Sequence, residues 1–80
     1  NAKIYILKKQ SYGYSIEEKK ADSSSFVGKV YQTSVSNSYM VQAASLSGHA
    51  FFDTEGNFIL ERIIEGSDFL SKDTFSKLAN

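Results

Sequence analysis

The residues best suited to chemistry in this chain are the oxygen-bearing side chains of the segment Asp53-Thr54-Glu55-Gly56-Asn57. Oxygen ligands around a glycine are typical of calcium loops, in which glycine is the sixth residue and a bidentate Glu the twelfth. Here the glycine comes fourth, and Glu65 lies one place beyond the twelfth position. The spacing therefore predicts no metal site in this segment.

Apolar runs on both sides of this segment indicate a structural role for it instead. Ala50-Phe51-Phe52 precedes it, and Phe58-Ile59-Leu60 follows it. Asp at the first turn position and Gly at the fourth fit a type I turn followed by a left-handed glycine. We predict a β-hairpin over residues 49–64, with Asp53 and Gly56 shaping its turn.

His49 is the only histidine, so it is the first candidate for a general base. A triad would also need a nucleophile and an orienting acid within reach. The chain has many serines but no Gly-x-Ser-x-Gly motif to single one out, and it has no glycine-rich phosphate loop. We therefore predict that His49 is a loop or strand-end residue, that the protein is not an enzyme, and that it uses no cofactor.

Tyr12 and Tyr14 are the strongest candidates for binding a partner. Tyrosine gives a large contact area at low entropic cost, and alternation along a strand would place both rings on one face. Four lysines flank them: Lys8, Lys9, Lys19 and Lys20. This pattern predicts a patch that binds a protein with an acidic or mixed-charge surface. The alternative, that the tyrosines pack in the core, stays open.

The charge distribution limits the classes of partner. The net charge is zero, with nine basic and nine acidic residues, which argues against binding to nucleic-acid phosphates. Residues 1–40 carry six lysines and three acids, whereas residues 41–80 carry three basic and six acidic residues, a dipolar arrangement that can steer a charged partner. No apolar run approaches the roughly 18 residues of a membrane span, so we predict no membrane insertion. Homo-oligomerisation is left open.

Eighty residues without cysteine predict one small domain, residues 1–80, with a thin core and no disulfides. The chain begins Asn-Ala without a methionine. Residues 1–2 are then an expression scar, or the chain is a fragment of a longer or signal-processed protein. The compartment stays undetermined, with a preference for a secreted or cell-envelope protein of bacterial origin.

A β-branched and aromatic run predicts a strand at residues 4–7, and further strands are predicted at residues 12–17, from their period-two pattern, and at residues 26–35, in addition to the hairpin. Residues 38–47 suit a strand and a helix nearly equally, and both are left open. A short C-terminal helix is predicted after Ser67 or Ser71 as the cap, with Phe75, Leu78 and Ala79 on one helical stripe.

These elements predict an α+β fold, in which a meander-like antiparallel sheet of four to six strands packs one face on the short C-terminal helix. The alternative is a small all-β sandwich or open barrel. The expected function is a non-enzymatic protein-interaction module, either a domain of a secreted or envelope bacterial protein or a small inhibitor or immunity-type protein. The alternative function is a small-ligand-binding domain with a pocket between sheet and helix.

Overall fold

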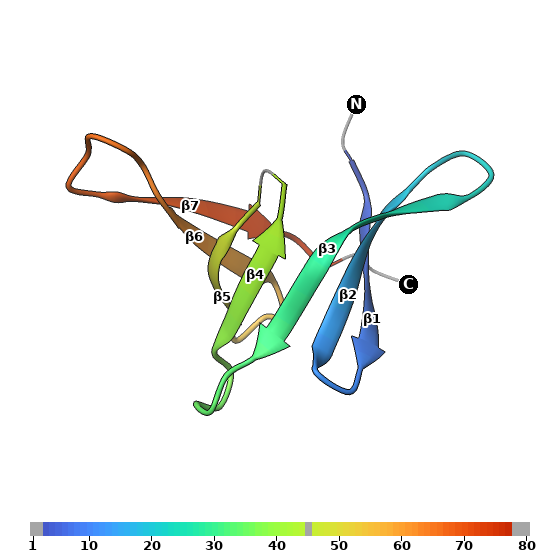
Figure 1. Cartoon of the computed structure of the whole chain (residues 1–80), viewed down its shortest axis with the longest axis horizontal. Coiled ribbons are helices and arrows are strands. Elements are labelled where there is room, and N and C mark those ends of the chain that lie inside the picture. Colours follow the sequence, from blue (N-terminus) through green and yellow to red (C-terminus); the bar gives the residue numbers. More distant parts are fainter. Residues whose placement is uncertain (1–2, 45, 78–80) are drawn as a thin grey trace.

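Seven antiparallel strands form one sheet in the computed structural model, which describes residues 3–44 and 46–77. The strands are β1 (Tyr5–Gln10), β2 (Gly13–Lys19), β3 (Ser24–Gln32), β4 (Tyr39–Ala43), β5 (Gly48–Phe52), β6 (Phe58–Ile63) and β7 (Leu70–Phe75). Each strand pairs with its neighbours in sequence, so the sheet order runs from β1 to β7 and every connection is a hairpin (Figure 1). The predicted antiparallel meander is confirmed, with more strands than expected.

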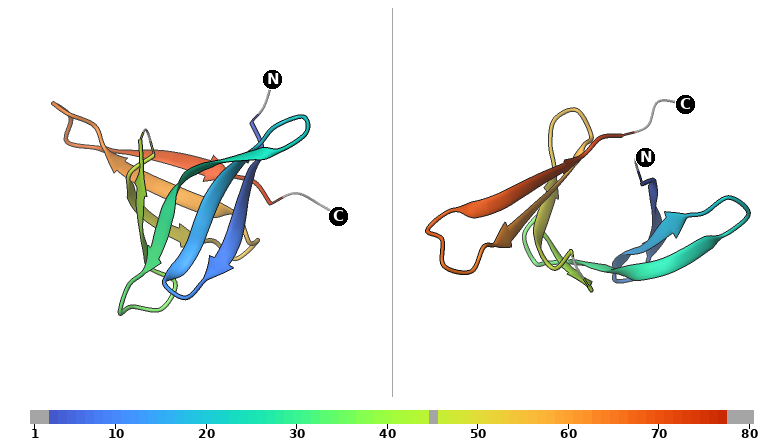
Figure 2. Two further views of the ribbon diagram at one scale, coloured as in Figure 1. Left: turned by 45° about the vertical axis from the view of Figure 1, so that its right-hand side comes forward. Right: turned by 90° about the horizontal axis from the view of Figure 1, so that it is seen from above.

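The sheet curls into a half-barrel. The strands β1, β2 and β3 form one wall and β5, β6 and β7 the other, and the two walls face each other across an opening (Figure 2). The pairing of β2 with β3 shifts register between Ile16 and Glu17. A β-bulge of this kind bends its strand and increases the local twist, which supports the curl.

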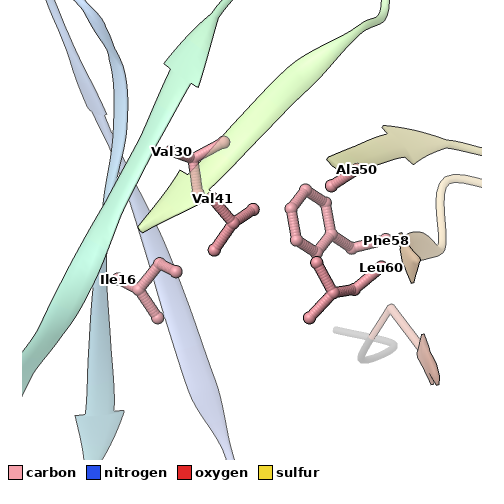
Figure 3. Close-up of a cluster of buried hydrophobic side chains, with 6 residues drawn as sticks. All are labelled: Ile16, Val30, Val41, Ala50, Phe58 and Leu60. Carbon is pink, nitrogen blue, oxygen red and sulfur yellow. The ribbon is translucent and has the colours of Figure 1, made fainter. Parts of the chain in front are cut away.

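The core lies on the concave face of the half-barrel. Its buried side chains come from five strands and point into the same interior (Figure 3): Ile16, Val30, Val41, Ala50, Phe58 and Leu60. Alternation explains the set, because register partners such as Val30 and Val41 place their side chains on the same face. A core of this size is thin, as expected for 80 residues.

The predicted hairpin turn is confirmed between β5 and β6. The backbone N–H of Asp53 donates to the carbonyl of Asn57 over 2.9 Å, and Gly56 has φ of 85°. The Asp53 carboxylate accepts hydrogen bonds from the N–H groups of Asn57 and Glu55, each over 2.9 Å. These backbone donors, that of Asn57 first, hold the pKa of Asp53 below its usual value. The carboxylate therefore shapes the turn.

We expect Gly56→Val to destabilise the protein by about 1–2 kcal/mol, because a β-branched residue is disfavoured at positive φ. The new side chain would also displace Lys77, whose Cδ lies 3.3 Å from the position of a Cβ on Gly56. A thermal melt measures the effect. A variant that melts with the wild-type protein would contradict the role assigned to Gly56.

The predicted α+β class is wrong, because the described residues contain seven strands and no helix. Strand β7 occupies most of the segment expected to be the C-terminal helix, and it pairs with β6 from Ile63↔Leu70 to Phe58↔Phe75. Leu78 and Ala79, the other members of the expected helical stripe, lie outside the described residues. The half-barrel is closer to the open-barrel alternative than to a sheet packed on a helix.

Residues 38–47, which the sequence left open, contain a strand. Strand β4 pairs with β3 on one side and β5 on the other, so both rows of its backbone groups are used. Val41 is buried in the core, and Tyr39 and Ala43 pack against that core. Burial of one face and pairing on both sides outweigh the helix propensity of this segment.

Candidate functional site

An apolar cavity of about 870 Å³ is lined by residues of the concave face, including residues of the two edge strands β1 and β7. We call it the concave groove. Most of the side chains that line it are apolar or aromatic, among them Tyr5, Leu7, Tyr14, Phe52, Phe58 and Phe75. Its volume is within the roughly 300–1,000 Å³ of sites that bind small molecules.

Aromatic rings cross the groove from one wall to the other. Tyr5 of β1 meets Phe75 of β7 edge to face, with 5.8 Å between ring centroids. Phe58 lies 6.4 Å from Phe75 and 5.2 Å from Phe52. The contact between Tyr5 and Phe75 joins the two edge strands through side chains alone, because β1 and β7 are not paired with each other. Packing of Tyr5 on Phe75 therefore sets the spacing of the walls.

Two tyrosines extend this row of rings beyond Phe52. The ring of Tyr39 lies 5.7 Å from that of Phe52, and the ring of Tyr14 lies 6.0 Å from that of Tyr39. Burial and the neighbouring Tyr14 raise the pKa of Tyr39, which keeps its hydroxyl protonated. Lys9 Nζ lies 5.2 Å from the centroid of the Tyr14 ring, within reach of a cation–π interaction. This end of the site combines apolar rings with hydroxyls that can hydrogen-bond a ligand.

Two lysines line the groove where the chain enters β1 and leaves β7. Lys3 and Lys77 both contribute to its wall, and the N–H of Lys77 donates to Asn57 Oδ1 over 2.9 Å. Among the described residues, no carboxylate lies within ion-pair distance of either ammonium group. Both ammonium groups are therefore available to pair with acidic groups of a ligand.

The structure separates the two tyrosines of the predicted patch. Strand β2 begins at Gly13, so Tyr12 belongs to the preceding turn and the expected alternation does not include it. Its ring packs 5.4 Å from that of Tyr31 on the outer face, with Lys29 Nζ 5.3 Å from its centroid. Tyr14 lines the concave groove. The expected common face is not formed, and a partner-binding role for either residue stays a prediction.

The four lysines of the predicted patch are also separated from one another in the structure. Lys8 pairs with Glu17 over 3.2 Å, whereas the neighbouring Lys9 covers Tyr14 on the concave side. Lys19 and Lys20 are exposed at the other end of β2, where Lys20 pairs with Glu18 over 3.4 Å. Of the six predicted residues, Tyr14 and Lys9 belong to the groove region. The signal that sequence reasoning missed is the row of inward aromatic residues on β1, β5, β6 and β7.

His49 has partners that the sequence did not reveal. Its Nε2 lies 2.9 Å from Ser38 Oγ, and its Nδ1 lies 3.7 Å from Glu61 Oε1. The three side chains have the order of a hydrolase triad, but 3.7 Å exceeds hydrogen-bond length and none of them lines the concave groove. We interpret them as cross-strand contacts, since His49 and Glu61 are register partners.

In the described part of the chain, no three His, Asp or Glu side chains gather in a way that would hold a metal ion. None of the described segments is a helix of the length and apolarity needed to cross a membrane. A scan against protein-family models and searches of curated proteins and of solved structures found no match for this chain.

Proposed function

We propose that the chain is a non-enzymatic protein-interaction module and that the concave groove receives an apolar segment of a partner protein. The observation that carries the proposal is the row of aromatic side chains that lines a groove between β1 and β7, the two edge strands of the sheet. Apolar surface of this extent is costly to leave in water, and such surfaces often mark binding sites.

The side chains of the groove have the chemistry of interaction hot spots. Binding energy concentrates in aromatic residues that lie in well-packed, desolvated positions. Phe52, Phe58 and Phe75 already support one another at centroid distances of 5.2 and 6.4 Å, so they lose little freedom when a partner covers them. A partner that buries this surface gains from it without rearranging the sheet.

A polypeptide fits the opening because the groove lies between two edge strands. Within the described residues, β1 pairs only with β2 and β7 only with β6. Each edge therefore presents unpaired backbone N–H and C=O groups beside the apolar interior. An extended segment can pair with an edge while placing alternate apolar side chains in the groove, as in β-strand addition.

The second candidate is the binding of a small apolar molecule, which the cavity volume of about 870 Å³ favours. The expected pocket between sheet and helix is wrong, because no helix is found among the described residues. The site for such a ligand is instead the concave face of the sheet itself.

Peptides selected from a random display library test the proposal. We expect the selected peptides to bind the wild-type protein and to lose at least about tenfold in affinity with Leu7→Ser, because Leu7 lines the groove. Ile6→Ser is the matched control: Ile6 is the adjacent residue of β1, has a similar half-buried environment and points to the opposite face. Its affinity should stay within about twofold of wild type.

Circular dichroism of both variants checks that the sheet is intact. Peptide binding that is insensitive to Leu7→Ser would overturn the proposal. If no peptide binds, and an apolar fluorescent probe such as anilinonaphthalene sulfonate binds in a Leu7-dependent way, the second candidate is the better account.

A further inference from the structure

We propose that the partner segment in the concave groove is the β6–β7 hairpin of a second copy of this chain, so that the protein associates head to tail. This inference rests on the proposed function and specifies its partner. It joins two surfaces of the molecule that are otherwise unexplained, an open apolar groove and an apolar hairpin tip.

The hairpin tip exposes four large apolar side chains: Ile63, Ile64, Phe69 and Leu70. We call these residues the apolar tip. Ile63 is 86% exposed and Phe69 is 79% exposed, the two highest values among the exposed large apolar residues. The hairpin projects from the body of the half-barrel, at the upper left of Figure 1. A protruding element with this composition has the shape and chemistry of a segment that inserts into an apolar site.

The tip cannot fill the groove of its own molecule. Tyr5 of β1 packs on Phe75 at the C-terminal end of β7, so the groove lies at that end, whereas the tip lies beyond the other end of β7. In the view from above, the hairpin points away from the interior of the half-barrel (Figure 2, right). Only a second molecule can bring a tip to the groove.

Charge favours the same pairing. The turn of the hairpin carries Glu65 and Asp68, both exposed and, within the described residues, outside any ion pair. The mouth of the groove carries Lys3 and Lys77, and neither ammonium group has an acid partner there. An acidic tip and a basic groove attract each other, and repulsion between like charges disfavours tip-to-tip and groove-to-groove contacts.

The contact is heterologous, because it joins two different surfaces. A one-way arrangement of such contacts forms rings or longer chains, whereas two molecules that exchange tips form a closed dimer whose interface as a whole is isologous. Both products require the same tip and the same groove, so one set of variants tests them.

Sedimentation equilibrium of the full chain, from micromolar to roughly millimolar concentration, measures the association. We expect the wild-type protein to associate and Phe69→Asp to weaken association at least about tenfold, because it places a charge where an apolar side chain inserts. Phe26→Asp is the matched control: Phe26 is also exposed, at 63%, but lies on β3 away from both surfaces. It should associate as wild type does.

A mixing experiment distinguishes tip-in-groove insertion from a contact between two tips. Phe69→Asp removes the tip but leaves the groove, and Leu7→Asp removes the groove but leaves the tip. Each variant alone should associate at least about tenfold more weakly than the wild-type protein, whereas their mixture should form 1:1 pairs through the one intact contact. Pairing should weaken as salt is raised. Glu65→Lys and Asp68→Lys in the molecule that supplies the tip should also weaken pairing. Lys3→Glu and Lys77→Glu in the molecule that supplies the groove should then restore it.

A wild-type chain that stays monomeric up to roughly millimolar concentration would overturn the inference, as would a mixture that fails to pair. Leu7-dependent peptide binding by such a monomer would leave the proposed function standing and remove only the second copy as the partner. Loss of both peptide binding and self-association would remove both.

Discussion

Replacement of Leu60 by alanine is expected to destabilise the protein by about 2–5 kcal/mol, through lost apolar burial and the cavity left behind. Leu60 is 1% exposed and is the largest fully buried side chain together with Val30. It lies at the centre of the concave face, between its register partners Ala50 and Asp73. Because a small domain has roughly 5–15 kcal/mol of stability or less, Leu60→Ala should leave much of the protein unfolded at 37 °C.

Urea unfolding followed by circular dichroism measures this loss. Ile63→Ala is the matched control, because Ile63 belongs to the same strand and is almost fully exposed. At a dilution at which the chain is monomeric, the control should cost about 1 kcal/mol or less, which is the range of strand propensities at exposed sites. Equal losses in the two variants would contradict the core described above.

Gly13→Ala is expected to cost about 3 kcal/mol or more, because two effects act at one position. Gly13 has φ of 145°, a conformation that side chains rarely adopt. A Cβ there would also stand 2.2 Å from the carbonyl oxygen of Val30, a backbone atom of the central strand β3 that cannot move without breaking its pairing. The expected result is a variant whose urea midpoint is far below that of the wild-type protein.

Gly66→Ala separates the two effects. Gly66 also has a positive φ, of 81°, but no atom lies within 4 Å of its Cβ position. Conformational strain alone should cost about 1–2 kcal/mol. The excess loss in Gly13→Ala then measures the close approach of β2 to β3, and a loss no larger than that of Gly66→Ala would show that the strands can separate to admit a methyl group.

The β5–β6 hairpin could be predicted from the sequence because its determinants are local. Asp53 accepts hydrogen bonds from the backbone of the turn, and Gly56 adopts the positive φ that the turn requires. Both features lie within five residues of chain. The apolar run that begins β6 is also local, and all three of its residues, Phe58, Ile59 and Leu60, are buried. Local turn chemistry and period-two patterns were sufficient for this hairpin, but not for β4 and β7.

Strand β7 was missed because two of its three less exposed positions, Ser71 and Asp73, are polar and only Phe75 is apolar. Asp73 lies opposite Leu60 on the concave side, where an apolar residue would have marked a strand. Arg62 compensates its charge through an ion pair of 2.7 Å, so the strand tolerates the acid. Ser67 and Ser71 resembled helix caps and so strengthened the wrong prediction of a helix. The segment is a strand because it pairs with the edge of β6 and because Phe75 packs against Phe58. Both effects depend on residues distant in the sequence.

The concave groove depends on curvature, which alternation does not reveal. The alternation of side chains shows which face of its own strand Tyr5 or Phe75 occupies. It does not show that the two rings come within 5.8 Å of each other, which requires the curl of the whole sheet. Likewise, Tyr12 does not share a face with Tyr14, because β2 begins only at Gly13. The candidate site is thus a product of the complete half-barrel.

The strictly sequential order of the strands has a consequence for how the protein folds. Each pairing closes only a short stretch of chain, so the loop-closure entropy of every step is small and the contact order is low for an all-β protein. Hairpins can form independently and join in any order. The exception is the contact of Tyr5 with Phe75, which joins residues at opposite ends of the sequence and requires all six pairings to be in place. We therefore expect the groove to be the last feature to form during folding and the first to open during thermal fluctuations.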